Sequence, residues 1–206
     1  MATLARPDDS SVYAGRVAAS PLRKDAVRNR RRIIEVGREL VADGAPVQLN
    51  EVARAAGVGV ATVYRHFPTP QALIEAVSVD GLEALIRAAE RAVDRDDPWT
   101  AFRDFLVGIV DAQLADAALS PVLSAPQAAL PGTAHLLERL SSLFTTLFGR
   151  VSEAGRLAPG ITLADMTPLM CGIAYSARLQ PADDPQARAA AGRHYLDVVL
   201  NGIRAR

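Results

Sequence analysis

The side chains best suited to chemistry with a partner lie in one short stretch, residues 60–66. Small, hydroxyl, phenol, guanidinium and imidazole groups follow one another there within two helical turns. On the open face of a short helix, such groups suit hydrogen bonding to base edges and phosphates in the major groove of double-stranded DNA. Arg65 can fork onto guanine, and Tyr64 can reach a phosphate. The residues expected to face DNA from this stretch are Val60, Ala61, Thr62, Tyr64, Arg65 and His66.

Two short helices separated by a turn must position these side chains. Residues 48–56 carry apolar residues at a helical spacing of three and four, which predicts one buried face. Gly57 suits the left-handed position just past a helix end, and Val58 can fill the corner between the helices. The second helix, residues 60–67, turns Val63 and Phe67 inward. The pattern is that of a helix-turn-helix.

A set of residues across this region carries a family resemblance. The set is Val52-Ala53, Ala56-Gly57-Val58, Thr62-Val63-Tyr64, Phe67 and Leu73. It resembles the DNA-reading domain of TetR-family transcriptional regulators, with specific motifs over residues 24–75 and only a succession of helices beyond. The resemblance implies a homodimer that binds operator DNA, with C-terminal helices enclosing a small-molecule pocket. By position in the family motif, Asn50 would reach a base or the backbone.

Three positions depart from the family pattern. The Thr or Ser that usually opens the second helix is Gln48, the Ser before the reading helix is Gly59, and the Lys after it is Pro70. Each change removes an expected cap or phosphate contact, so those contacts are not carried over. Gln48 remains among the residues expected near DNA by its position.

The charge distribution favours DNA contact at the N-terminal end. Residues 1–67 hold 11 Lys and Arg against 7 Asp and Glu, whereas residues 68–206 hold 12 against 16. Four arginines cluster in the first half of the helix expected at residues 23–43, and either a solvated face or phosphate contacts would explain them. Arg28 and Arg31 are the two expected to contact phosphates. Residues 1–20 are expected to be a disordered arm, either inert or reaching phosphates.

The fold class expected from composition and periodicity is all-α, with about nine helices. Half of the residues are hydrophobic and few are aromatic. A three-helix DNA-binding domain is expected at residues 21–68, followed by an effector-binding and dimerisation domain at residues 69–206. No apolar run is long enough for a membrane span, and neither a secretory signal nor a cysteine pair is present, so a cytoplasmic protein is expected. The expected helices are residues 23–43, 48–56, 60–67, 70–94, 98–114, a short one near 121–125, 133–154, 163–179 and a last one from 185.

Catalysis, cofactors and metals are not expected. His66, His135 and His194 lie on three different helices, and none has an acidic or thiol neighbour at metal spacing. No glycine-rich phosphate loop or nucleophile elbow is present. Cys171 is expected to be a small core residue. An enzyme on this fold and an architectural DNA-binding protein without a ligand are the two alternatives to an effector-released repressor.

A set of aromatic and Met residues on the C-terminal helices fits either core or pocket. Residues at helical spacing usually fill a core, while the resemblance implies a mostly apolar pocket for a small apolar or amphipathic effector. The expected lining residues are Trp99, Phe102, Phe105, Phe144, Phe148, Met166, Met170 and Tyr175. Candidates for polar groups that orient the effector are Thr145, Gln113, His135, Ser176 and Tyr175.

The last two helices are expected to form the dimer interface. The helix at residues 163–179 is apolar nearly all round, so its own domain cannot cover every side. Two such helices from each subunit would make an isologous four-helix contact. The expected interface residues are Leu169, Ile173, Leu196, Val199 and Ile203.

The helix at residues 70–94 is expected to connect reading and effector sites. It begins three residues after Phe67 and extends about 37 Å, so a tilt at one end moves the other. Gly81 in its middle permits either a bend or close packing with another helix.

Overall fold

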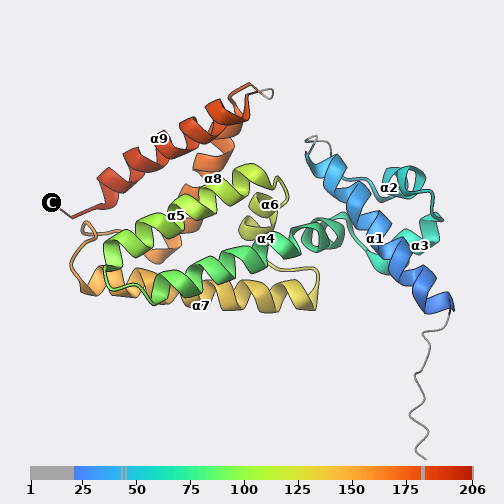
Figure 1. Ribbon diagram of the computed structural model, residues 1–206, viewed down its shortest axis with the longest axis horizontal. Coiled ribbons are helices and arrows are strands. Elements are labelled where there is room, and N and C mark those ends of the chain that lie inside the picture. The colour runs from blue at the N-terminus through green and yellow to red at the C-terminus, as the bar shows by residue number, and fades with distance from the viewer. Residues whose placement is uncertain (1–20, 43, 45, 182–183, 206) are drawn as a thin grey trace, which may run out of the picture.

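The structure is a computed structural model that describes residues 21–42, 44, 46–181 and 184–205. The arm expected at residues 1–20 lies outside the described residues. The described part folds into nine helices without a strand element, which confirms the all-α prediction (Figure 1). The helices are α1 (Pro21–Ala42), α2 (Leu49–Ala56), α3 (Val60–His66), α4 (Pro70–Val93), α5 (Pro98–Ala115), α6 (Leu119–Ser124), α7 (Pro131–Glu153), α8 (Leu163–Arg178) and α9 (Pro185–Ile203).

Local side-chain caps set where three of the long helices begin. Thr69 Oγ1 accepts a hydrogen bond from the Ala72 N–H at 3.1 Å, and Asp184 does the same for Ala187 at 2.8 Å. Asp97 accepts from the backbone N–H groups of the first turn of α5. Each cap is followed by a proline, whose missing N–H costs nothing at the first helical position. These caps and prolines place the starts of α4, α5 and α9 at the positions expected from the sequence, residues 70, 98 and 185.

The turn between α2 and α3 depends on one glycine in the left-handed region. Gly57 has φ 63° and ψ 35°, a conformation that costs a residue with a Cβ about 1–2 kcal/mol. Its N–H donates to the Arg54 oxygen at 3.2 Å, and the Val58 N–H donates to Ala53 at 3.1 Å. This Schellman pattern satisfies the last carbonyls of α2 and turns the chain into α3. Neither Gln48 nor Gly59 forms a side-chain cap, as their departure from the family pattern predicted.

Helix α1 packs on the three-helix core with the apolar stripe that its sequence indicates, except at the first member. The stripe is Val27, Ile33, Ile34, Gly37, Leu40 and Val41, and Val27 is 65% exposed. Ile33 is fully buried, and a Cβ at Gly37 would lie 3.1 Å from Leu73 Cγ. Close approach at Gly37 therefore brings α1 directly against α4.

Helix α4 belongs to two hydrophobic cores. It runs out of the α1–α3 unit and along α7 and α5 in the C-terminal unit (Figure 1). Its first half supplies Ala72, Leu73, Ala76 and Val77 to the first core, and its second half supplies Leu82, Leu85, Ile86, Ala89 and Ala92 to the second.

Gly81 separates the two halves of α4 without ending the helix. A Cβ at Gly81 would lie 3.1 Å from Leu119 Cδ1 and 3.2 Å from Asp116 Oδ2. Of the two roles considered for Gly81, the structure therefore supports close packing, in this case against the start of α6.

Helix α5 is the central helix of the C-terminal unit. It packs against α4 and α7 on one side and against α8 and α9 on the other (Figure 1). Phe102 and Leu106 are fully buried, and the Phe102 ring stacks on Phe144 of α7 at 6.0 Å between centroids. In the described part of the chain, no helix combines the length and apolar character that a membrane crossing requires.

Candidate DNA-binding surface and effector cavity

The open face of α3 presents the residues that the sequence predicts for base contacts. Val63 and Phe67 are buried and hold α3 on the three-helix core. On the opposite side, Val60 and Tyr64 are 46% and 47% exposed, large fractions for residues of these types. Ala61 and Arg65 are exposed, and Thr62 and His66 are half-buried.

The surface next to α3 adds polar and cationic groups. Gln48 and Asn50 are exposed at the start of α2. On α1, Arg28 pairs with Asp25 at 2.5 Å and Arg31 with Glu35 at 3.0 Å, and all four side chains are more than half exposed. Exposed ion pairs contribute about 0–1 kcal/mol, so a phosphate can replace either carboxylate at little cost.

Two arginines of α1, Arg30 and Arg32, are directed toward the helix-turn-helix, whereas Arg28 and Arg31 are exposed to solvent. The Arg30 guanidinium carbon lies 5.6 Å from the Phe67 ring centroid, in cation–π geometry at the end of α3. A Cβ at Gly57 would lie 3.6 Å from Arg32 Nη2, so Arg32 reaches the turn between α2 and α3. The sequence pattern does not reveal these contacts of Arg30 and Arg32, because Phe67 and Gly57 lie outside α1.

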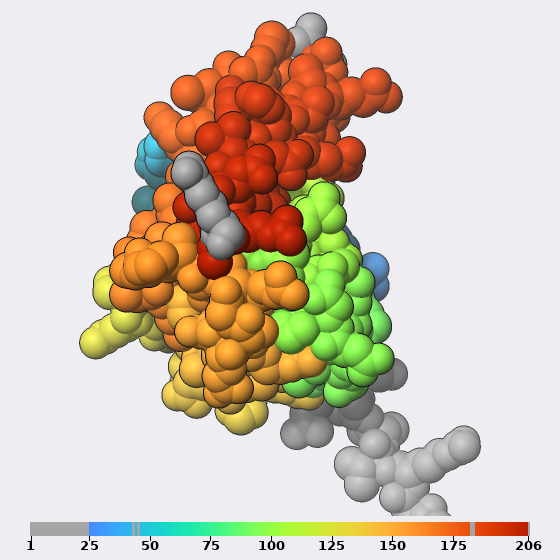
Figure 2. Space-filling model, turned by 90° about the vertical axis from the view of Figure 1, so that its left-hand side faces the viewer, coloured from blue at the N-terminus to red at the C-terminus, as the bar shows by residue number. Residues whose placement is uncertain are grey.

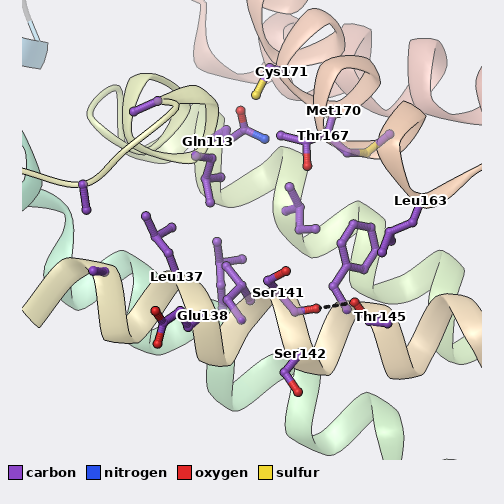
Figure 3. Close-up of a pocket in the computed structure, with 18 of the residues that line it drawn as sticks. Gln113, Leu137, Glu138, Ser141, Ser142, Thr145, Leu163, Thr167, Met170 and Cys171 are labelled. Atoms are coloured by element: carbon purple, nitrogen blue, oxygen red, sulfur yellow. Dashed lines mark hydrogen bonds between the residues drawn. The ribbon is translucent and has the colours of Figure 1, made fainter.

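A cavity of about 730 Å³ lies inside the C-terminal unit, between α5, α7, α8 and the segment at residues 125–128 (Figure 3). Its volume is within the usual range for a small-molecule site. Apolar side chains from α4, α5, α7 and α8 dominate the wall, with a few hydroxyl and amide groups between them. The lining residues are Leu85, Phe105, Ile109, Gln113, Leu123, Ala125, Pro126, Gln127, Ala128, Ala134, Leu137, Glu138, Leu140, Ser141, Ser142, Phe144, Thr145, Leu163, Thr167, Met170 and Cys171.

The structure brings together only part of the expected pocket set. Phe105, Phe144 and Met170 line the cavity. Tyr175 is 69% exposed and cannot line it, so the expectation for this residue is wrong. The expected residues that the structure places in the packed core instead of the cavity wall are Trp99, Phe102, Phe148 and Met166.

Only some of the polar residues that were expected to orient an effector lie in the cavity wall. Gln113 and Thr145 line the cavity, whereas His135, Ser176 and Tyr175 do not. Sequence reasoning missed Ser141, Ser142 and Thr167, whose signal was the run of hydroxyl residues along an otherwise amphipathic α7 and at one turn of α8. The Thr145 hydroxyl donates to the Ser141 backbone oxygen at 2.8 Å, which leaves its oxygen free to accept.

Cys171 lines the cavity instead of filling the core. It is half-buried, and burial raises the pKa of its thiol. A thiol with a raised pKa stays protonated at neutral pH, so it contributes a weakly polar surface and no thiolate.

A buried carboxylate joins α4 to the segment beside the cavity. Glu75 is fully buried, and its two oxygens accept hydrogen bonds from the backbone N–H groups of Ala129 at 2.7 Å and Leu130 at 2.9 Å. Gln71 donates to the same carboxylate at 3.2 Å. Leu130 is the N-cap residue of α7, where the partial positive charge of the helix end favours a carboxylate. Sequence reasoning missed Glu75, whose signal was an acidic residue amid the buried stripe of α4.

Three of the expected interface residues face inward. Ile173, Leu196 and Ile203 are buried in the core of their own chain, so their expected place at a dimer interface is wrong. Leu169 and Val199 are half-buried and pack against the same core.

The opposite sides of α8 and α9 carry the exposed apolar surface. Tyr175, Leu179 and Val198 are 69%, 70% and 59% exposed. Gly172 and Gly202 are exposed beside them, with open space where a Cβ would be. Figure 2 shows α9 uncovered at the surface of the C-terminal unit. No cluster of metal-ligating side chains occurs among the residues that the structure describes.

Comparison with known proteins identifies the helix-turn-helix region by its sequence. Residues 33–77 match the family model described as bacterial regulatory proteins, tetR family. The matched residues extend from the middle of α1 through α2 and α3 to the first turns of α4. The match thus concerns the helix-turn-helix and the two helices on either side of it.

Individual proteins resemble the chain over different lengths. The HTH-type transcriptional regulator SAB2452 of Staphylococcus aureus is 40% identical over 48 residues, which cover 22% of this chain and 26% of that regulator. The chain thus matches about a quarter of that relative's length. A TetR transcription regulatory protein from Mycobacterium vanbaalenii is 30% identical, with 90% of this chain and 100% of that chain covered and a TM-score of 0.44. The transcriptional regulator FadR from Bacillus subtilis, in complex with stearoyl-CoA, is 14% identical with a TM-score of 0.59, covering 84% and 98%. This last likeness concerns the fold.

The hydrogen bonds of Glu75 predict that a substitution of nearly the same shape lowers the stability of the protein. Glu75→Gln keeps the shape but turns an amide NH₂ toward a backbone N–H, so one buried donor loses its acceptor. We expect the free energy of unfolding to fall by about 1–3 kcal/mol in urea denaturation. Glu83→Gln is the matched control, because Glu83 lies on the same helix in an exposed pair with Arg87 and should change stability by less than about 0.5 kcal/mol. Equal effects of the two substitutions would contradict the role assigned to Glu75.

Proposed function

The chain belongs to the TetR family of bacterial transcriptional regulators, and on this premise we propose that it is a cytoplasmic repressor released from DNA by a small effector. A homodimer would bind operator DNA through α3, and a small apolar or amphipathic effector would enter the cavity. Residues 21–68 would form the DNA-binding domain, and residues 69–206 the effector-binding and dimerisation domain. The observation that carries the proposal is that α4 joins the core beneath α3 to the wall of the cavity.

Operator recognition would depend on the exposed face of α3. Thr62, Tyr64, Arg65 and His66 carry hydrogen-bonding groups, with Tyr64 and Arg65 exposed and Thr62 and His66 half-buried. Val60 and Ala61 would touch base edges through apolar contact. Asn50, Gln48, Arg28 and Arg31 flank this face, and they would fix its register on the phosphate backbone.

The homodimer would form through the outer sides of α8 and α9. Tyr175, Leu179 and Val198 leave more apolar side-chain surface in water than helices of a monomer usually do. Gly172 and Gly202 would let a partner helix approach closely. A two-fold axis between the subunits would place this surface against its own copy and make a four-helix contact.

Two attachments would transmit effector binding along α4. Leu85 of α4 lines the cavity directly, and Glu75 of α4 holds the residues that follow the lining segment 125–128. An effector that displaced either wall would tilt a rod about 36 Å long. In a dimer, this tilt would change the spacing of two reading helices that must fit successive turns of DNA. FadR shows that a protein of this fold can hold a ligand with a long apolar chain.

The reading role of α3 predicts a split between base and phosphate contacts. With operator duplexes selected from a random library by the wild-type protein, Arg65→Ala should weaken binding by about 1–3 kcal/mol and relax preference at one base pair. Arg28→Ala and Arg31→Ala should weaken selected and random duplexes alike and lower the salt slope by about one each. Titrations at several salt concentrations measure both effects. Arg87→Ala, an exposed arginine of α4, serves as the control, and equal losses on both duplexes for Arg65→Ala would make Arg65 a phosphate contact.

If the subunits associate through the outer sides of α8 and α9, a charged side chain placed on this surface should weaken the dimer. Val198→Glu should raise the dimer dissociation constant about tenfold or more, because an unpaired carboxylate would be removed from water at the interface. Val27→Glu is the matched control, since Val27 is equally exposed but lies on α1. Sedimentation velocity at micromolar concentration decides the matter. A wild-type species of 21.9 kDa, or a Val198→Glu protein that associates as the wild type does, would contradict this interface.

If effector binding is transmitted along α4, a larger side chain in the cavity wall should lower operator affinity as an effector does. Ala134→Phe adds a ring to the cavity wall on α7 and should lower operator affinity about fivefold or more. The same substitution in a Glu75→Gln background should have a smaller effect, because one attachment to α4 is weakened. Ala84→Phe, on the exposed side of α4, is the control. Unchanged operator affinity in a folded Ala134→Phe protein would favour a DNA-binding protein that does not respond to a ligand.

A further inference from the structure

Within the part of the chain that the structure describes, the cavity wall contains one buried side-chain amide whose oxygen is hydrogen-bonded and whose nitrogen is not. Gln113, near the end of α5, is fully buried. Its side-chain oxygen accepts a hydrogen bond from Ser120 Oγ at 2.7 Å, and its backbone oxygen accepts from the Arg178 guanidinium. Its amide nitrogen, Nε2, has no hydrogen-bond partner among the described residues. In Figure 3 the amide nitrogen points across the cavity toward Thr167, with Cys171 above it.

The position of Gln113 makes its free N–H group a recognition element. An amide donor removed from water without an acceptor keeps its full desolvation cost, and a ligand that supplies the acceptor recovers it. The surrounding wall is apolar, with Ile109, Leu123 and Met170 on neighbouring elements. In such surroundings one hydrogen bond orients a ligand that is otherwise held by apolar contact.

The charge of the wall decides what kind of acceptor fits. Among the lining residues there is no Lys, Arg or His, and the one charged side chain is Glu138 of α7. The Arg178 guanidinium is directed to the Gln113 backbone and is not part of the wall. A carboxylate or phosphate would lose its water shell here without a cation to replace it, and Glu138 would repel it. A neutral oxygen has neither penalty.

We propose that the effector is an uncharged amphipathic molecule whose carbonyl oxygen accepts a hydrogen bond from Gln113 Nε2, with its apolar body along α5 and α7. The inference rests on the proposed function, because it takes the cavity to be the effector site. It adds the chemical class of the ligand and the residue that selects it. Ketones, esters, lactones and amides share this chemistry, while fatty acids and phosphorylated compounds do not.

Three matched fluorescent probes test the proposal. They are 6-propionyl-2-(dimethylamino)naphthalene, whose emission shifts when its ketone accepts a hydrogen bond, its 6-propyl analogue without an oxygen, and 6-(dimethylamino)-2-naphthoate as the anion. We expect wild-type protein to bind the ketone most tightly and the carboxylate most weakly. Titration by fluorescence gives the three dissociation constants.

Substitution of Gln113 isolates the hydrogen bond. Gln113→Leu should weaken ketone binding about three- to tenfold, shift the emission of the bound ketone to the blue and leave the propyl analogue unchanged. Its thermal unfolding midpoint should stay close to that of wild type, because an unpaired buried donor is removed while the Ser120 hydroxyl loses its acceptor. Gln127→Leu is the matched control, since Gln127 lines the cavity but is exposed.

The outcomes separate this inference from the proposed function. Equal losses for ketone and propyl analogue in Gln113→Leu, or tighter wild-type binding of the carboxylate than of the ketone, would overturn the proposed ligand class while leaving the cavity as a ligand site. Retention of ketone affinity in a folded Gln113→Leu protein would overturn it as well. If no probe shows saturable binding to wild-type protein, the cavity is not a ligand site, and the proposed function itself is contradicted.

Discussion

A single helix, α4, has to complete two hydrophobic cores, and the rest of the structure depends on this constraint. Its first turns bury Leu73 against α1, and its later turns bury Leu82 and Ile86 against the C-terminal helices. A helix is stiff over this length, so the two units cannot change their relation without moving buried side chains at one end or the other. Gly81 sets the distance at which α6 meets α4, and Glu75 fixes α7 to the same helix. These contacts make α4 a mechanical link, where a flexible linker would let each unit move alone.

The cavity and the packed core divide the aromatic residues of the C-terminal unit between them. Phe102 and Phe148 interact edge-to-face at 6.1 Å within the core, whereas Phe105 and Phe144 reach the cavity wall. A cavity of this size forgoes packing that a filled core would provide. On the α7 wall the Thr145 hydroxyl donates to a backbone oxygen of its own helix and the Ser141 side chain is exposed, so neither needs a partner in the cavity. Gln113 is different, since its side-chain nitrogen is buried without a hydrogen-bond partner among the described residues.

Helix α3 is held in place by tertiary packing. Gly59 and Gln48 provide no side-chain caps, and α3 has only 7 residues, too few to be stable alone. Val63 and Phe67 anchor it to the core, and the Arg30 guanidinium covers the Phe67 ring at its end. The side chains on the exposed face of α3 are therefore not needed to hold the helix in place. The orientation of its exposed side chains depends on residues of the core.

The sequence alone determined the features that depend on neighbours within a few residues. Caps at Thr69, Asp97 and Asp184 and the left-handed Gly57 predict where helices begin and end, because each satisfies backbone groups of its own turn. Pattern alone also indicated the helix-turn-helix. Of the five polar candidates that followed from the family resemblance, two, Gln113 and Thr145, line the cavity. The start of α6 was predicted two residues late, since its N-cap residue, Ala118, has no side chain that can cap the helix.

Only the tertiary structure decided which face of each helix is buried against its own chain. Helices α8 and α9 carry apolar residues on more than one side, and packing against α5 selected Ile173 and Leu196 for the interior and left Tyr175 and Val198 outside. Periodicity reports that a face is apolar but not what covers it. The partners of Glu75 lie 54 and 55 residues away along the chain, and no local pattern contains that contact. Which aromatic residues border the cavity was settled likewise, because a void is a property of several packed helices together and of none of them alone.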